Sequence, residues 1–481
     1  MIRARAVNVG PVRKRPVAHE IQAEEVMRRC FFFALLLAGA LRCEARYSGG
    51  SGTTDDPYLI STAEDMVDLA HTLDDWWLCF RQTADIDLGE TTARAVVMIG
   101  TEEMPFGGIF DGGGHAIANF TCTYEGANGV GLFGVVRNYS AEIRNVVLLD
   151  PNVSAPAVEY VGALVGRVRN GSVNNCHVRR ACVTGHMGVG GLVGWNQGAI
   201  ANCSATGVVS GALSVGGLLG VTFWGEDVTD CWAEAVVTGD KRVGGFAGNC
   251  SLASIHWCCA AGKAEGQIDV GGFLGCGEGG VVTNSYTTAA ATGSMYVGGF
   301  VGRNDLSCNC SAGALPSEII QCYATGAVTG ESLSGGLVGS NHESIVQRCF
   351  WDIETSGLAT SDGGTGLPTA QLQQAQTFMD AFWDFSIRAN SLHFWIIRAE
   401  PGYPRFGWQT IPGDLDNDGD VDVCDFCGLA HDWSHADTSF WSGGSDLTGD
   451  GRVGYADLAT FSQHWLHGCR PGADTPTAAR R

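Results

Sequence analysis

The chain has 481 residues, a length that predicts two to four domains. Glycine accounts for 69 of them, about twice its usual share. The net charge is −22, and because such a surface repels nucleic acid and anionic lipid, the composition argues against both as partners.

The first segment, residues 1–45, has the pattern of a secretory signal peptide. Arg28 and Arg29 precede an apolar run at 31–41 that is too short to span a bilayer but fits a signal-peptide core. The segment therefore predicts export, with Met27 as an alternative start. The other interpretation of the same run is a membrane anchor that is retained. No later apolar run is long enough to cross a membrane, so we expect no further span.

A six-residue motif of the type VGGLVG dominates the middle of the chain. Its copies follow one another at steps of about 27 residues, and the last step is longer because of an insertion around residues 306–316. Clear copies begin at Val161, Val189, Val215, Val243, Val270, Val297 and Ser334, and a weaker one at Gly129. A fixed period of this length predicts a solenoid in which each repeat forms one coil.

The second constant element of each repeat is a cysteine that follows the hexamer. Stacked coils would place these residues in one ladder, with Asn175, Asn202 and Asn284 beside it. The positions are Cys176, Cys203, Cys231, Cys258, Ser285, Cys322 and Cys349. Three uses are open: inward packing of small apolar groups, disulfides between neighbouring coils, and a metal site. We expect Cys203, Cys231 and Cys258 to face inward.

The composition of the repeats favours strands over helices. Each hexamer has two or three glycines, and short apolar runs rich in Val and Thr end at Gly or Asn. About 27 residues can make one coil with two or three short sides. We therefore expect an all-β, right-handed parallel β-solenoid (β-helix) of about eight coils over residues 105–355. In it, Leu192, Leu218 and Phe246 should lie in one column.

These hexamers resemble the GLUG repeat, which is found in bacterial surface and secreted proteins. Residues 46–104, with GTTDDPYLISTAEDMVDLA and DIDLG, resemble the N-terminal capping segment of such solenoids. Residues 356–411, with GGTGLPTAQLQQAQTFMDAFWDF and PGYPRFGW, resemble their C-terminal cap. The resemblance implies the fold and a place outside the cell, but no single activity.

The C-terminal cap combines a helical pattern with a group of aromatic residues. Residues 369–385 predict a short amphipathic helix. We expect the rings to plug the last coil, and the alternative is the core of a small separate domain. The rings belong to Phe378, Phe382, Trp383, Phe385, Phe394, Trp395, Tyr403, Phe406 and Trp408.

The repeats show no clear catalytic signature. GVGLFG at Gly129 has the form of a dinucleotide fingerprint, but no βαβ unit surrounds it. The densest acidic group is Glu226, Asp227, Asp230 and Glu234, and the next coil has no carboxylate at the same offsets. We expect this group to be a solvated turn rather than the paired carboxylates that polysaccharide hydrolysis requires.

Two twelve-residue segments near the C-terminus have the spacing of calcium-binding loops. Carboxylates at positions 1, 3 and 5, a backbone carbonyl at 7 and a bidentate carboxylate at 12 supply the oxygen ligands that calcium prefers. The second loop has fewer carboxylates, so we expect it to bind more weakly. The predicted ligands are Asp414, Asp416, Asp418, Asp420 and Asp425 in the first loop, and Asp446, Thr448, Asp450, Arg452 (through its carbonyl) and Asp457 in the second.

A helical pattern follows each loop, and such loop–helix pairs with Asp at position 12 resemble a type I dockerin over residues 412–468. The resemblance implies a small α module that binds two calcium ions and a cohesin-like protein or cell-surface scaffold. In that family, positions 10 and 11 of each loop help to choose the partner. These positions are Val423 and Cys424 in the first loop, and Tyr455 and Ala456 in the second. Residues 469–481 are expected to be a disordered tail.

The sequence therefore predicts an exported, non-catalytic protein whose solenoid is an adhesion or display surface and whose C-terminal module docks it through calcium. The alternative is a polysaccharide-degrading enzyme (a glycoside hydrolase or lyase) or accessory subunit of a cellulosome-like complex, because dockerins often accompany such enzymes. Two carboxylates facing each other would favour that alternative. A third interpretation is a structural protein of the cell envelope whose acidic surface binds calcium broadly.

Overall fold

The computed structural model describes residues 47–89, 98–306, 314–385, 395–397 and 402–406, together with Val421, Phe426, 429–430, 454–463 and Trp465. The predicted signal peptide at 1–45 and the tail at 469–481 lie outside these residues. In the part of the chain that the structure describes, no helix is long and apolar enough to cross a membrane.

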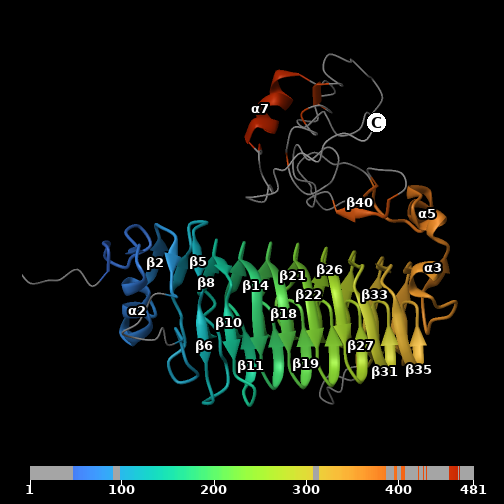
Figure 1. The fold of residues 1–481 in the computed structure, drawn as a ribbon, viewed down its shortest axis with the longest axis horizontal. Helices are drawn as coiled ribbons and strands as arrows, with labels where there is room; N and C mark the ends of the chain where they lie inside the picture. The colour runs from blue at the N-terminus through green and yellow to red at the C-terminus, as the bar shows by residue number, and fades with distance from the viewer. Residues whose placement is uncertain are drawn as a thin grey trace, which may run out of the picture.

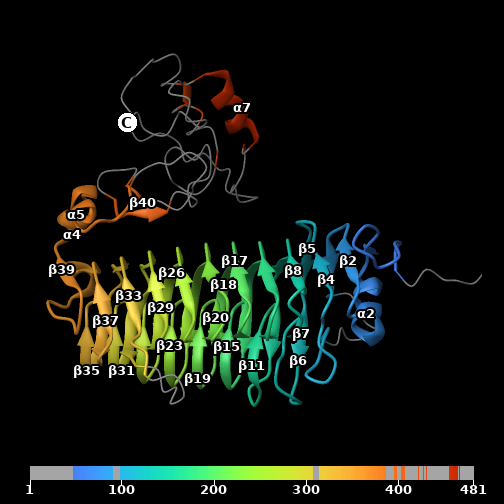
Figure 2. The ribbon, with the colours of Figure 1, turned by 180° about the vertical axis from the view of Figure 1, so that it is seen from behind.

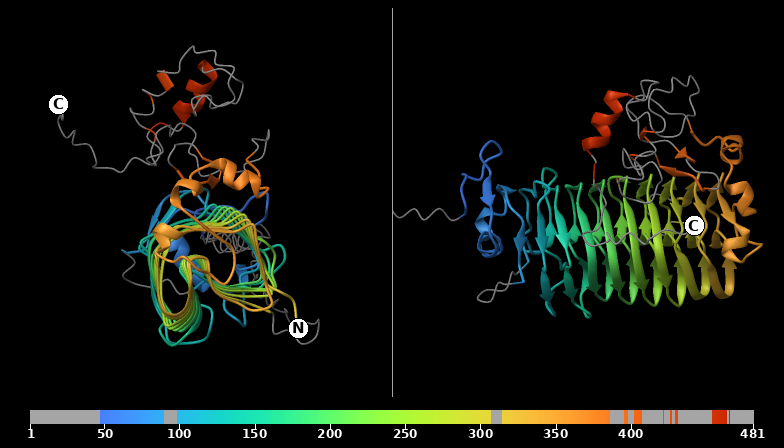
Figure 3. Two further views of the ribbon diagram at one scale, coloured as in Figure 1. Left: turned by 90° about the vertical axis from the view of Figure 1, so that its right-hand side faces the viewer. Right: turned by 45° about the horizontal axis from the view of Figure 1, so that its top comes forward.

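The main body is a stack of coils that extends along the long axis of the molecule (Figure 1, Figure 2). The strands of each coil run parallel to those of the next coil. Viewed nearly down this axis, the coils lie over one another in one outline (Figure 3). Strands of successive coils form three parallel sheets, which we call sheets A, B and C. A small antiparallel pair, β40 (Trp395–Ile396) and β41 (Arg405–Phe406), lies outside the stack.

Sheet A has 11 strands: β1 (Tyr58–Ile60), β2 (Cys79–Gln82), β4 (Ile109–Asp111), β8 (Glu142–Arg144), β13 (Ser172–Asn174), β17 (Ala199–Ala201), β21 (Val228–Thr229), β25 (Ser254–His256), β29 (Val281–Thr283), β33 (Glu318–Ile320) and β37 (Ile345–Gln347). Sheet C has eight strands: β7 (Phe133–Val136), β12 (Val165–Val168), β16 (Val193–Asn196), β20 (Leu219–Phe223), β24 (Ala247–Ser251), β28 (Leu274–Glu278), β32 (Val301–Asp305) and β36 (Val338–Asn341).

Sheet B has 20 strands: β3 (Ile86–Asp87), β5 (Ala116–Ala118), β6 (Thr121–Thr123), β9 (Val147–Leu149), β10 (Asn152–Ser154), β11 (Glu159–Gly162), β14 (His177–Thr184), β15 (Met187–Gly190), β18 (Ser204–Ser210), β19 (Leu213–Gly216), β22 (Trp232–Thr238), β23 (Lys241–Gly244), β26 (Cys259–Glu265), β27 (Ile268–Gly271), β30 (Tyr286–Thr287), β31 (Ala290–Gly298), β34 (Tyr323–Ala324), β35 (Val328–Gly335), β38 (Phe350–Asp352) and β39 (Thr365–Leu367). The helices are α2 (Ala63–His71), the 3-10 turn η1 (Leu73–Asp75), α3 (Ile353–Ser356), α4 (Thr369–Leu372), α5 (Ala375–Asp380) and α7 (Tyr455–Gln463).

The expected parallel β-solenoid is confirmed, and its repeats are in register. Val161 pairs with Val189, and Val189 with Val215. The Leu192 amide donates to the carbonyl of Leu218, whose own amide donates to Phe246, so the expected column forms. Eight coils each give one strand to sheet C, and bridges from residues 99 and 106 to β7 begin an earlier one. The right hand of the coil stays a prediction.

The geometry of the corner between two strands explains which residues occur in and before the hexamer. The residue before each clear copy has a left-handed backbone: for example, φ is 63° at Tyr160, 64° at Gly188 and 59° at Asp269. The third residue of most copies approaches the next coil closely. A Cβ on Gly191 would lie 2.2 Å from the carbonyl oxygen of Gly217, so this corner stacks at strand spacing only with glycine, whereas the copy at Val161 has Ala163 at the same place.

The cysteine ladder faces inward, as expected, and Cys203, Cys231 and Cys258 are fully buried. The ladder cysteines are free thiols rather than disulfides. Each thiol satisfies backbone groups at a corner: Cys203 Sγ accepts from the amide of Cys176 at 3.4 Å and donates to the carbonyl of Ala201 at 3.1 Å. Ser285 takes the same place, because its Oγ accepts from the amide of Cys258 at 3.2 Å. The ladder residues therefore pack inward, as the sequence suggested, and in addition form hydrogen bonds with backbone groups at the corners.

The N-terminal end of the core is closed by α2 and the turn after it (Figure 1). Thr62 and Asp65 form a reciprocal capping box at the start of α2. Met66, Leu69 and Trp76 are buried in the same hydrophobic cluster as the coils. β1 and β2 also belong to sheet A, so residues 46–104 share a ladder with the repeats that follow.

The C-terminal aromatic residues do not plug the last coil, and the sequence prediction was wrong on this point. The last coil is closed by polar hydrogen bonds: Thr360 and Ser361 accept from the amides of Gly336 and Val338. Open strand edges have unpaired backbone groups, which backbone and hydroxyl groups satisfy here.

The rings instead fold back over the outside of sheet B, in a segment at 368–406 that we call the clasp. Its rings cover a column of aromatic residues on neighbouring strands, such as Tyr323, which lies 6.0 Å from Phe378 between ring centroids. The Trp383 indole donates to the carbonyl of Arg348 at 3.0 Å. The predicted helix at 369–385 is split into α4 and α5. Phe394 and Trp408 lie outside the described residues.

Replacing Cys203 tests the role of the ladder. Cys203→Ala should lower the free energy of unfolding by about 1–3 kcal/mol, because it leaves the buried amide of Cys176 without an acceptor. Cys203→Ser should cost less than half as much, since Ser285 shows that an oxygen fits the position. Chemical denaturation measures both. Equal losses for the two variants would contradict the hydrogen-bonding role.

Replacing Trp383 tests the clasp. Trp383→Ala removes a buried ring and its hydrogen bond, a change that costs about 3–5 kcal/mol in a packed core. Limited proteolysis should then cut within 368–406 much faster, while the coils stay resistant. Phe382→Ala is the matched control because that ring is 74% exposed. The same cleavage rate in both variants would show that the clasp does not depend on Trp383.

Candidate functional site

The outward side chains of sheet C form the face on which the repeats differ most. The first residue after each hexamer points outward, and so does the second residue beyond it, because side chains alternate along a strand. We call these residues the outer face of sheet C. The first column is Val135, Arg167, Trp195, Val221, Asn249, Cys276, Arg303 and Ser340. The second column is Arg137, Arg169, Gln197, Phe223, Ser251, Glu278, Asp305 and His342.

Three arginines of this face gather around one carboxylate at its N-terminal end. Glu102 comes from the loop before β7, and its Oε1 lies 3.3 Å from the Arg137 guanidinium and within hydrogen-bond reach of Arg169. Its Oε2 lies 3.7 Å from Arg167. Burial, reinforced by the neighbouring charge of Arg169, lowers the pKa of Arg167. One carboxylate cannot accept from every N–H group of three guanidinium groups, so this end of the face keeps donors that lack acceptors.

Aromatic rings on successive coils continue from the arginines. The Arg167 guanidinium lies 4.3 Å from the centre of the Trp195 ring and 5.0 Å from that of Tyr160, both within cation–π range. Trp195 stacks on Phe223 at 6.3 Å, and Trp224, which follows, is 64% exposed. We call Arg137, Arg167, Arg169, Tyr160, Trp195 and Phe223 the arginine–aromatic cluster.

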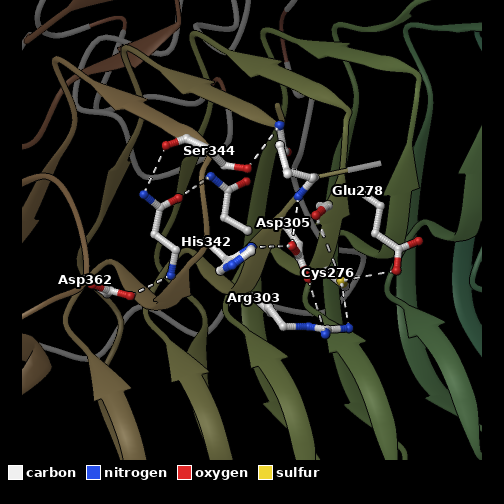
Figure 4. A network of polar contacts seen from close by, with 12 residues as sticks. Cys276, Glu278, Arg303, Asp305, His342, Ser344 and Asp362 are labelled. Atoms are coloured by element: carbon white, nitrogen blue, oxygen red, sulfur yellow. Dashed lines mark hydrogen bonds and ion pairs between the residues drawn. The ribbon is translucent and has the colours of Figure 1, made fainter. Parts of the chain in front are cut away.

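The C-terminal end of the face is a network of ion pairs and hydrogen bonds (Figure 4). Arg303 reaches Asp269 at 3.2 Å and Asp305 at 3.5 Å, and its guanidinium donates to Cys276 Sγ at 3.6 Å. The His342 ring lies 3.3 Å from Asp305. Glu278 pairs with Arg242 of the preceding corner at 2.6 Å. Asp269, Glu278 and Asp305 therefore each have a cationic partner, whereas Asp362 at the edge of the network accepts from the amide of Asn341.

Asp269 is the most deeply buried carboxyl of this network, with 1% of its surface exposed. Burial raises its pKa, and the charge of Arg303 opposes that rise. Within the described residues, neither carboxylate oxygen has a hydrogen-bond donor in good geometry apart from the ion pair with Arg303. The carboxyl thus lies beside Arg303 and near Glu278, on the side of the coil where β27 meets sheet C.

Most of the predicted calcium and partner residues lie outside the described residues, so their geometry stays a prediction. These are Asp414, Asp416, Asp418, Asp420, Val423, Cys424, Asp425, Asp446, Thr448, Asp450 and Arg452. Tyr455, Ala456 and Asp457 begin α7, which is the helix expected after the second loop. Tyr455 is 84% exposed.

A small hydrophobic core joins described residues of this C-terminal module to α7. Val421, at position 8 of the first loop, is buried against Leu429 and Phe461. Phe426 lies 5.9 Å from Phe461 between ring centroids, and Phe461 lies 5.5 Å from Trp465. One residue of the first loop therefore packs on the helix that follows the second loop.

The acidic group at 226–234 behaves as expected: Glu226, Asp227 and Glu234 are exposed and Asp230 is half-buried. The arginine–aromatic cluster and the buried Asp269, in contrast, were not identified from the sequence. A signal for both existed. The residues directly before and after the constant hexamers vary from copy to copy, and these positions hold Tyr160, Arg167, Trp195 and Asp269.

Comparisons with known proteins place the repeats in a known motif class. The GLUG motif matches residues 185–210 and 293–329. Halomucin of Haloquadratum walsbyi is 30% identical over 201 residues, which are 38% of this chain and 2% of halomucin. A protein of Evansella cellulosilytica named as a Gly-rich membrane protein is 32% identical over 138 residues, 27% of this chain and 15% of that protein. The chain thus spans only a small part of these relatives.

Among solved structures, a Bacteroides ovatus protein assigned as an immunoglobulin A1 protease aligns with a TM-score of 0.36 and 18% identity. The alignment covers 76% of this chain and 96% of that one. The two motif matches fall on coils that pair in parallel with their neighbours, at β15 to β18 and at β31 to β35. The chain therefore carries GLUG motifs on coils of a parallel β-solenoid.

Proposed function

We propose that this is an exported, non-catalytic surface protein whose solenoid presents the outer face of sheet C for adhesion or display. The observation that carries the proposal is the arginine–aromatic cluster, in which half-exposed rings and guanidinium groups lie side by side on successive coils. Aromatic and arginine side chains are the groups most enriched where proteins bind other molecules. The repeats shared with halomucin and the Gly-rich membrane protein support a place at or outside the cell surface.

The carboxylates of the same face support a non-catalytic role. Glycoside hydrolysis needs one carboxyl that holds a proton and a second that attacks or activates water. On this face Glu102, Glu278 and Asp305 each pair with at least one arginine. These ion pairs occupy oxygens of all three carboxylates, which would have to leave their arginine partners before they could attack a sugar or activate water.

One observation favours the alternative, a polysaccharide-degrading enzyme. Burial raises the pKa of Asp269, and Glu278 is among the charges that act on it. A protonated carboxyl beside an ionised one is the arrangement such enzymes use. The ion pair with Arg303 opposes protonation, and this is why we prefer a binding role.

Turnover assays separate the two functions. The full chain, incubated with plant and bacterial polysaccharides, should bind without releasing reducing ends or unsaturated sugars. Asp269→Asn should give the same result as the unmodified chain. Release of sugars by the chain, and its loss in Asp269→Asn, would establish the enzyme instead.

For the C-terminal module we propose two calcium ions and a docking role toward a cohesin-like protein or a cell-surface scaffold. The first loop has five Asp side chains between Asp414 and Asp422, whose like charges repel unless a cation lies among them. The packing of Val421 on Leu429 and Phe461 supports a link between loop and helices. Binding energy would then contribute to the stability of the module. Val423, Cys424, Tyr455 and Ala456 are the proposed partner positions.

Calorimetry on the full chain tests the calcium sites. Two ions should bind, the first loop about tenfold more tightly, because affinity rises with ligand charge. Asp425→Ala should remove the tighter site and Asp457→Ala the weaker one. Glu331→Ala, an exposed acid of sheet B, is the control and should change neither site. If Asp457→Ala weakened binding more than Asp425→Ala, the ranking would be wrong.

Docking is tested on cells that export the chain. The protein should be found at the cell surface and should be released by a calcium chelator. The double variant Asp425→Ala, Asp457→Ala should be exported but recovered in the medium. Attachment that survives both treatments would show that the module does not hold the protein through calcium.

A further inference from the structure

We propose that the arginine–aromatic cluster is a binding site for an acidic polysaccharide, a chain of sugars that carry carboxylates. The inference deepens the proposed function and rests on it, because it names what the adhesion surface binds. It depends on three observations: the excess of arginine donors over acceptors, the row of aromatic rings beside them, and the acidity of the rest of the chain.

The donors of the cluster outnumber its acceptors. Three guanidinium groups offer about fifteen N–H donors, and one carboxylate offers about four acceptor positions. Glu102 is the carboxylate shared by Arg137, Arg167 and Arg169. The Nε–H of each arginine has no acceptor among the described atoms. Glu159, which pairs with Asn128 beside Tyr160, and the exposed Glu103, which follows Glu102 in the chain, are further carboxylates of this region. The N–H groups that lack acceptors, rather than a net positive charge, are therefore what points to a ligand.

Carboxylates are the acceptors that fit this arrangement. A guanidinium binds a carboxylate through two parallel N–H···O bonds, and such charge-assisted bonds are about twice as strong as neutral ones. The side chains of Arg137 and Arg169 are about a third exposed, so an incoming carboxylate can reach their ends without displacing the coil. Glu102 contacts each of the three arginines through a single nitrogen, which leaves other N–H groups of each guanidinium for a ligand carboxylate.

The rings identify the rest of the ligand as flat and repetitive. Tyr160, Trp195 and Phe223 lie on three successive coils, with centroids 6.0 and 6.3 Å apart. The Trp195 ring lies between the Arg167 guanidinium and the Phe223 ring, so the rings offer their apolar edges to a ligand. A linear polysaccharide running along the solenoid axis would therefore meet one ring edge on each coil, with its carboxylates on the arginine side.

The charge of the whole protein confines any polyanion to the cluster. The net charge of −22 repels nucleic acid and an acidic polysaccharide alike, so we expect neither to bind away from the three arginines. The exposed Glu226 and Asp227 follow Trp224 at the far end of the rings and add to that repulsion. A neutral polysaccharide, in turn, would leave the three guanidinium groups unused.

The test compares two forms of one polymer. The full chain is mixed with polygalacturonate, or with the same polymer after methyl esterification of its carboxylates, in the presence of a chelator so that calcium does not bridge the polymer. Calorimetry reports binding, and the change in total tryptophan fluorescence, compared with that of Trp195→Ala, shows the part that comes from Trp195. We expect the acidic form to bind at least tenfold more tightly than the ester.

Variants assign the binding to the cluster. Arg167→Gln and Arg169→Gln should each weaken binding of the acidic polymer roughly 10- to 100-fold, as loss of a charge-assisted bond does. Arg169→Lys keeps the positive charge but loses the planar guanidinium, so its affinity should lie between those of the unmodified chain and Arg169→Gln. Trp195→Ala should weaken both polymers about tenfold. Arg180→Gln is the matched control, because Arg180 is an arginine of sheet B with one carboxylate partner, Asp150, and should change nothing.

Several results would overturn the inference: equal binding of the two polymers, no binding of either, tighter binding of a single-stranded RNA than of polygalacturonate, or the same affinity in Arg167→Gln and Arg180→Gln. Thermal melting of each variant shows whether it is folded. If Arg167→Gln does not fold, Arg169→Lys takes its place in the comparison with Arg180→Gln. A chain that still attaches to cells through calcium but ignores both polymers would overturn only this inference and leave the docking proposal standing.

Discussion

The pairing of each coil with the next through parallel backbone hydrogen bonds is the constraint on which the rest of the structure depends. Val161, Val189 and Val215 can follow one another in one ladder only if every coil repeats the same path. The corners must then turn at the same places, and this requires left-handed backbone at residues such as Tyr160 and a bare Cα at Gly191. The thiol ladder has the same origin, since each corner amide needs an acceptor from the coil above.

This constraint explains why so much of the fold could be predicted from the sequence. A hexamer that returns about every 27 residues fixes the period, and its glycines fix the strand assignment. The inward column through Leu192 and Phe246 followed from the same period. What the sequence could not predict depends on contacts across the repeat. The aromatic rings of the clasp were expected at the end of the stack. They instead cover Tyr286, Tyr323 and Phe350, which form an apolar column on the outside of sheet B.

The candidate site was missed for a related reason. Arg169 and Glu102 are 67 residues apart, and the loop that holds Glu102 belongs to no repeat. The repeat period therefore identifies the positions where side chains are free to vary. It does not predict which of these side chains contact each other in the folded protein. The predicted calcium ligands came from a local loop pattern. They are independent of the solenoid, and for the same reason its geometry neither supports nor opposes them.

The inward thiols also affect how the protein survives outside a cell. While the coils are stacked, an oxidant has no path to Cys176, Cys203 or Cys231, which are fully buried. Once the coils separate, the same thiols lie on a flexible chain about one repeat apart, and exposed thiols are open to oxidation to disulfides or higher states. In an oxidising medium, disulfides or oxidised thiols formed in the unfolded chain would then prevent it from refolding. In such a medium the lifetime of the protein would then be set by the rate at which the stack opens, rather than by its equilibrium stability.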